Sequence, residues 1–127
     1  MRSYTVAIAS LAIDAPVRWT DNILSQYDIP EVVSVRRGVA RKLTHSAVIR
    51  LAIVRQLHTE LGIGVGDAIR LTAALLDSNP AGMLASAHLT LSVNRLLVEH
   101  SVNSRLADAL ESSPNRRRGR PPAGSRR

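Results

Sequence analysis

The C-terminal segment limits how much of this chain can fold. It reads PNRRRGRPPAGSRR, from Pro114 to Arg127, and holds six arginines but no large apolar side chain. Such a segment cannot bury enough apolar surface to offset the entropy lost on ordering it. The foldable part is therefore residues 1–113, enough for one modest domain of roughly 80 to 110 ordered residues.

The hydrophobic residues of this part are almost all aliphatic. The chain has no Phe, one Trp and two Tyr, although 45% of its residues are hydrophobic. A core of Ala, Val, Ile and Leu suits small packed helices. The absence of Cys excludes a disulfide framework and fits a reducing cytosol. The apolar run near the N-terminus, about nine residues broken by Asp14 and Pro16, is too short for a membrane span. We expect a mainly α-helical, cytoplasmic protein with no membrane segment.

Residues 5–26 predict two short helices joined by a tight turn. Thr5 is placed to cap the first helix, which would run to about Ala12. Asp14 is placed to cap the second, with Pro16 in its first turn, where a missing N–H costs nothing. Helical spacing directs Trp19, Ile23 and Leu24 of the second helix inward. The residues expected to face outward are Arg18, Thr20, Asp21, Ser25 and Gln26.

Residues 32–43 predict a β-hairpin. Two short β-branched runs flank Arg36-Arg37-Gly38, and a glycine between two such runs is a hairpin signal. The tip and the second strand carry Arg36, Arg37, Arg41 and Lys42. The hairpin would therefore form a small basic wing beside the two helices.

The rest of the folded part predicts two helices, one strand and a final helix. Residues 44–61 have a helical apolar period with Thr44 or Ser46 as cap and Gly62 as stop, and residues 66–77 form a shorter helix. Apolar and polar residues alternate over 83–93, which favours a strand. The positions expected along the apolar stripe of the long helix are Val48, Leu51, Ala52, Val54 or Arg55, Leu57 and Leu61.

From Asn94 the period is helical again. Val98, Val102, Leu106 and Leu110 recur at every fourth position. A narrow apolar stripe of this kind serves either a dimer contact or packing on the same domain, and the sequence leaves both interpretations open.

Residues from Tyr4 to about Leu76 resemble the DNA-binding domain of the MerR family of bacterial winged helix-turn-helix regulators. The resemblance rests on Tyr4-Thr5-Val6 at the start of the first helix and Arg18-Trp19 in the second. It also rests on Gly38 and Arg41-Lys42-Leu43, which come before Thr44, the cap of the next helix. The later order of long helix, Leu-Gly and short helix matches as well. It implies a winged helix-turn-helix over residues 4–77 that binds double-stranded DNA as a homodimer.

Physical chemistry gives the same residues a role on DNA. A helix that projects Arg18, Thr20 and Gln26 could enter the major groove, where arginine pairs with guanine and amides pair with adenine. Basic residues of the wing would contact phosphates and position the domain. The candidate contacts in the domain are Thr5, Arg18, Trp19, Thr20, Gln26, Arg36, Arg37, Arg41 and Lys42.

The C-terminal tail carries most of the positive charge. Six of the seventeen Lys and Arg lie in residues 116–127, so residues 1–115 hold eleven basic and ten acidic residues, a net charge of +1. The core Arg118-Gly119-Arg120-Pro121 resembles an AT-hook. A glycine lets the backbone lie on the floor of a narrow A·T-rich minor groove, and the flanking arginines follow that floor. The predicted tail contacts are Arg117, Arg118, Gly119, Arg120 and Pro121, and a nonspecific phosphate-binding tail is the alternative.

The sequence contains no pattern typical of a metal site, a phosphate-binding loop or a catalytic site. The four histidines, at positions 45, 58, 88 and 100, form no pair with metal-ligand spacing. Glycines 62, 64 and 66 fall between helices and are better interpreted as a turn than as a phosphate loop. We expect no catalytic site, no metal and no cofactor.

The sequence therefore predicts three regions. Residues 1–78 form the winged helix-turn-helix, residues 79–113 a packing or dimerisation segment with a strand and a helix, and residues 114–127 a disordered basic tail. The expected function is that of a nucleoid-associated DNA-binding protein, a transcriptional regulator. The alternative is a protein-interaction adaptor or antitoxin-like protein with a nonspecific nucleic-acid-binding tail.

Overall fold

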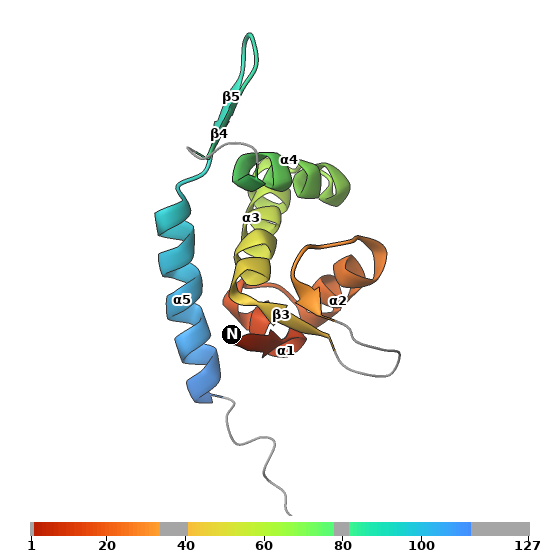
Figure 1. Cartoon of the computed structure of the whole chain (residues 1–127), viewed down its shortest axis with the longest axis vertical. Coiled ribbons are helices and arrows are strands. Elements are labelled where there is room, and N and C mark those ends of the chain that lie inside the picture. The colour runs from red at the N-terminus through yellow and green to blue at the C-terminus, as the bar shows by residue number, and fades with distance from the viewer. Residues whose placement is uncertain (1, 34–40, 78–81, 113–127) are drawn as a thin grey trace, which may run out of the picture.

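A computed structural model describes residues 2–33, 41–77 and 82–112. These residues are mainly helical with small antiparallel sheets, which confirms the expected class. In Figure 1, α5 runs along one side of the molecule and the β4–β5 hairpin extends away from the helices. The elements are β1 (Ser3–Thr5), α1 (Val6–Ala12), α2 (Val17–Gln26), β2 (Val32–Val33), β3 (Lys42–Thr44), α3 (His45–Leu61), α4 (Val65–Asp77), β4 (Met83–Ala85), β5 (Thr90–Ser92) and α5 (Arg95–Ser112).

The turn between α1 and α2 differs from the prediction at Asp14. Thr5 caps α1 as expected, since its hydroxyl accepts a hydrogen bond from Ile8 N at 3.2 Å. The N-cap of α2, however, is Pro16, with no side-chain cap. Asp14 lies two residues earlier and adopts a left-handed φ of 58° as the chain leaves α1, so its carboxylate does not reach the N-terminus of α2. The prediction that Asp14 caps α2 is wrong.

The prediction that Thr20 faces outward is also wrong. Its side chain is fully buried, and its hydroxyl accepts a hydrogen bond from Ser10 Oγ at 2.8 Å and donates to Pro16 O at 3.4 Å. This polar contact joins α1 to α2 inside an otherwise aliphatic core. A buried hydroxyl that is left without a partner costs about 1 to 3 kcal/mol, so the pair fixes how the two helices pack.

The first sheet places β3 between β1 and β2, and both pairings are antiparallel. Leu43 lies opposite Tyr4 on one side and Val32 on the other, and its side chain is fully buried. The pairing of β2 with β3 fits the two strands predicted for the hairpin. Its predicted tip, with Arg36 and Arg37, lies outside the described residues.

The long helix α3 forms the centre of the core. Thr44 caps its start by accepting a hydrogen bond from Ala47 N, and Gly62 ends it in the left-handed conformation with a φ of 70°. Both were predicted. The expected apolar stripe is buried except for Leu61, which is 60% exposed at the last residue of the helix.

The helix α4 packs against α3 with Ala68, Thr72 and Leu75 buried. Thr72 satisfies its hydroxyl within the helix by donating to Ala68 O. Arg50 of α3 forms an ion pair with Asp77 at the C-terminal end of α4. The two helices are thus joined by apolar contacts and by one charged pair.

The single strand predicted over residues 83–93 is instead a hairpin. Strands β4 and β5 pair antiparallel, with Leu84 opposite Leu91. The turn forms because Ser86 N donates to Leu89 O at 2.8 Å and the Ser86 hydroxyl accepts from Leu89 N at 3.1 Å. The side chains alternate in both strands, so a periodicity of two could not reveal the turn between them.

The helix α5 begins where predicted, since Asn94 Oδ1 accepts a hydrogen bond from Leu97 N. Its apolar stripe packs on the same chain: Val102 and Leu106 are buried against the core, and α5 contacts α1 and α3. Packing within the domain is therefore confirmed for Val102 and Leu106. Over the residues that the structure describes, no helix is both long and apolar enough to cross a membrane.

Candidate nucleic-acid interface

The outer face of α2 is polar and exposed. Arg18, Asn22, Ser25 and Gln26 are all exposed, whereas Ile23 and Leu24 are buried beneath them. Arg18 and Asn22 are four residues apart and so lie one above the other on the helix surface. The face therefore offers guanidinium and amide groups, the side chains that pair best with guanine and adenine edges.

Asn22 was not among the residues predicted to contact DNA. It shares the exposed face with Arg18, while Thr20, which was predicted, is buried. A helical wheel centred on the buried Ile23 and Leu24 would have found it, because Asn22 then falls opposite the core.

Arg41 and Asp21 bring the start of β3 to the side of α2. Arg41 Nη1 lies 3.5 Å from Asp21 Oδ1, with 33% and 55% of the two side chains exposed. An exposed pair of this kind adds little stability, typically below about 1 kcal/mol. The pair instead changes the local charge, because Arg41 neutralises the Asp21 carboxylate on the outer part of α2.

Lys42 follows Arg41 in the chain and adds a second positive charge. It is exposed in β3 and lies opposite Thr5 in β1 and Val33 in β2. Among the described residues it has no ion-pair partner. Thr5 lies opposite Lys42 in β1, but its hydroxyl already accepts a hydrogen bond from Ile8 N as the cap of α1.

Trp19 lies between α2 and α3. It is half-buried, with its ring centroid 4.8 Å from the Arg55 guanidinium and 6.2 Å from the His58 ring. This is packing with a cation–π contact, worth roughly 0.5 to 2 kcal/mol. The position favours Trp19 as a residue that holds α2 against α3.

Seven predicted contact residues lie outside the residues that the structure describes. They are Arg36, Arg37, Arg117, Arg118, Gly119, Arg120 and Pro121. The structure leaves Arg18 and Gln26 exposed on α2 and brings Arg41 to that helix through Asp21, whereas Lys42 is exposed in β3 between Thr5 and Val33. It places Thr20 in the core and leaves Thr5 at the rim of the site.

Two of the four histidines, His45 and His58, have hydrogen-bond partners that hold elements together. His45 Nε2 lies 2.6 Å from Asn103 Oδ1, which joins the start of α3 to α5, and His58 Nδ1 lies 2.9 Å from Ile63 O. Within residues 2–33, 41–77 and 82–112, no three His, Asp or Glu side chains gather where they could hold a metal ion.

No protein-family model, curated protein or solved structure matches the chain.

The Asp21–Arg41 pair gives a prediction for DNA affinity. If Arg41 contacts a DNA phosphate, as the sequence predicts, replacing it by Ala should weaken binding roughly tenfold, about 1.4 kcal/mol, because that contact would be lost and Asp21 left unneutralised. Asp21→Asn should strengthen binding severalfold, and the double variant should lie between. The measurement is fluorescence anisotropy on one duplex at fixed salt.

The control for this cycle is Asp67→Asn in α4. It changes the net charge by the same amount as Asp21→Asn and also breaks an ion pair, with Arg70. It should leave DNA affinity unchanged. Equal gains from the two Asn variants would mean that total charge decides affinity and that α2 has no special position.

Proposed function

We propose that this protein binds double-stranded DNA through the outer face of α2 and the basic start of β3. The observation that supports it best is the contact between Arg41 and Asp21, which holds the cationic residue just before β3 against an exposed polar helix. Arg18, Asn22 and Gln26 would meet base edges in the major groove. Arg41 and Lys42 would contact the neighbouring phosphates.

The arrangement of elements supports a winged helix-turn-helix similar to that of the MerR family. The chain passes through two short helices, a β-strand pair and a capped long helix in the order the resemblance requires. In this proposal α2 is the recognition helix and the β2–β3 hairpin is the wing. The function would then be transcriptional regulation in the nucleoid.

The Arg-Gly-Arg-Pro tail supports the same function by a separate route. Tethered to the domain, it would occupy an adjacent A·T-rich minor groove and raise affinity through its high local concentration. The proposal therefore has two contacts with different preferences: the domain in the major groove and the tail in the minor groove.

Removal of the tail tests this division. A protein that ends at Ser113 should lose most of its preference for A·T-rich over G·C-rich duplexes and bind both more weakly, with a shallower dependence on salt. Residual binding should remain, since the domain retains its own contacts. Anisotropy titrations of both proteins at two salt concentrations measure this. Complete loss of binding on truncation would show that the tail is the whole DNA-binding element.

The proposal includes a homodimer, and the surface we assign to it is the β4–β5 hairpin with the start of α5. Leu89 and Leu96 are 76% and 78% exposed, and residues 83–94 contain no Asp, Glu, Lys or Arg. An isolated two-stranded hairpin is marginally stable and its uncharged edges invite pairing. A second copy with the same neutral, apolar hairpin is the complementary occupant, because a self-paired hairpin covers both leucine surfaces at once.

The mass in solution tests the dimer. The full-length protein should elute as a dimer in light-scattering chromatography, and Leu89→Ser/Leu96→Ser should elute as a folded monomer. Leu11→Ser, which removes another exposed leucine at a distance in α1, should remain a dimer. A monomeric wild type that instead captures one stoichiometric partner protein would support the adaptor function.

A further inference from the structure

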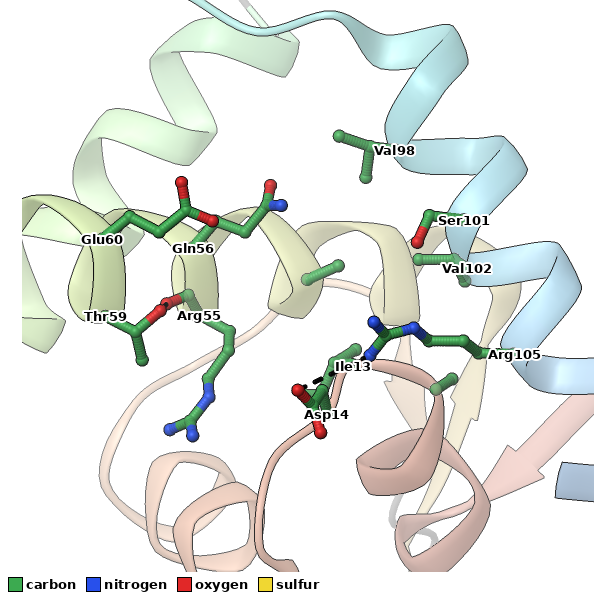
Figure 2. A pocket seen from close by; sticks show the side chains of 12 residues that line it. Ile13, Asp14, Arg55, Gln56, Thr59, Glu60, Val98, Ser101, Val102 and Arg105 are labelled. Carbon is green, nitrogen blue, oxygen red and sulfur yellow. Dashed lines mark hydrogen bonds and ion pairs between the residues drawn. The ribbon is translucent and has the colours of Figure 1, made fainter.

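A second candidate site lies between α1, α3 and α5 and includes no residue of α2. It is a cavity of about 280 Å³, shown in Figure 2. Ala52, Val98 and Val102 form part of its apolar lining. Cavities that hold small-molecule ligands usually measure about 300 to 1,000 Å³, so a ligand here would have to be small.

Each of the two long helices brings a polar pair to this cavity, one with an acidic and the other with a basic member. Arg55 also lines the cavity from α3, but its guanidinium lies over the Trp19 ring of α2. On α3, Gln56 and Glu60 are four residues apart, and on α5, Ser101 and Arg105 have the same spacing. Figure 2 shows the pair from α3 on one side and the pair from α5 on the other. The pair from α3 thus offers a carboxylate and an amide, and the pair from α5 a guanidinium and a hydroxyl.

Glu60 and Arg105, the charged members of the two pairs, have capacity left for a ligand. Glu60 has no ion-pair partner among the described residues. Arg105 reaches Asp14 only through Nη1, at 3.8 Å, and 85% of the Asp14 side chain is exposed. Its remaining N–H donors are available to a carboxylate, which a guanidinium binds through two parallel hydrogen bonds.

An apolar groove continues from the cavity. It has a volume of about 340 Å³ and shares Gln56, Glu60, Val98 and Ser101 with the cavity. Beyond them it is lined by aliphatic side chains, among them Leu57, Leu91 and Leu97. A ligand that fits both spaces would carry a head with both charges and an aliphatic side chain.

We propose that this cavity binds a small aliphatic α-amino acid. Its carboxylate would accept hydrogen bonds from Arg105 and Ser101, and its ammonium group would donate to Glu60 and Gln56. The side chain would extend into the groove between α3 and α5. Each charge of the zwitterion then meets the opposite charge of Glu60 or Arg105, whereas a simple anion or cation would leave one of these two side chains unmatched.

The site is connected to the proposed DNA-binding helix at two points. Arg105 pairs with Asp14 in the turn that precedes α2, and Arg55, which also lines the cavity, lies over Trp19 of α2. A ligand carboxylate would compete with Asp14 for Arg105 and release one restraint on that turn. Amino-acid binding should therefore lower DNA affinity, a consequence that rests on the proposed function, whereas the binding itself does not.

The test is calorimetric titration of the full-length protein with L-leucine in the absence of DNA. We expect saturable binding at millimolar concentrations or below. L-leucinamide, which lacks the carboxylate, and 4-methylpentanoate, which lacks the ammonium group, should bind at least roughly tenfold more weakly, since each loses a charge-assisted contact. L-valine and L-isoleucine define the preferred side chain.

Variants assign the two ends of the ligand. Arg105→Gln and Glu60→Gln should each weaken L-leucine binding by roughly tenfold or more, but Glu60→Gln should leave the weak binding of 4-methylpentanoate unchanged. Arg95→Gln and Glu111→Gln, with the same charge changes on exposed parts of α5, should bind L-leucine like the wild type. Absence of binding by all three amino acids, or equal binding of L-leucine and L-leucinamide, would overturn the proposal. Because no DNA is present, failure of the proposed function leaves this result unaffected.

Discussion

Replacing Leu43 by Ala should lower the free energy of unfolding by about 2 to 5 kcal/mol. Leu43 is fully buried in the middle strand of the first sheet, between Tyr4 and Val32, and is followed directly by the cap of α3. The loss combines the transfer energy of the removed atoms with a cavity that backbone pairing on both sides prevents from closing. Since small domains are stable by only about 5 to 15 kcal/mol, this is a large fraction of the total.

Leu61→Ala provides the matched control. It removes the same atoms from a side chain that is 60% exposed at the end of α3, so it should change stability by no more than about 0.5 kcal/mol. Urea unfolding followed by circular dichroism measures both variants. Equal, small effects would mean that Leu43 is not at the centre of the core.

The second large effect is expected on DNA binding. Arg18→Ala/Lys42→Ala should weaken affinity for duplex DNA by roughly 10- to 100-fold at physiological salt and reduce the slope of log K against log salt by about two. Both side chains are exposed, and neither has an ion-pair partner among the described residues. Their removal should therefore act on DNA contacts and leave the fold intact.

The control variant removes the same formal charge elsewhere. Arg70→Ala/Arg95→Ala takes two exposed arginines from α4 and α5 and should change affinity less than threefold, below about 0.7 kcal/mol. Anisotropy titrations at several salt concentrations give both affinity and slope. Equal losses in the two double variants would contradict an interface on α2 and β3 and indicate binding governed by net charge.

Local signals in the sequence predicted most helix boundaries. Thr5, Thr44 and Gly62 act through hydrogen bonds and backbone conformations within a few residues, and all three perform the predicted roles. Asp14 failed because its φ of 58° is set by how the chain leaves α1. The turn at Ser86 to Leu89 was missed because it interrupts an alternation that both strands share.

The candidate site was predicted only in part because its geometry depends on contacts distant in sequence. Thr20 shares the buried face of α2 with Ile23 and Leu24, but the partner of its hydroxyl, Ser10, is ten positions away, and Arg41 is positioned by Asp21, twenty positions away. A residue count along one helix cannot supply either contact. Arg18 and Gln26 were predicted correctly to face outward, since their exposure follows from the periodicity of α2 itself.

The most direct test of DNA binding by α2 is to observe that helix while DNA is added. Backbone amide spectra of ¹⁵N-labelled full-length protein should be recorded during titration with an A·T-rich duplex. We expect the largest shift changes at residues 17–26 and 41–44, together with changes in residues 114–127. Changes confined to residues 114–127, with the amides of α2 and β3 unaffected at saturation, would contradict the proposal that the domain reads DNA.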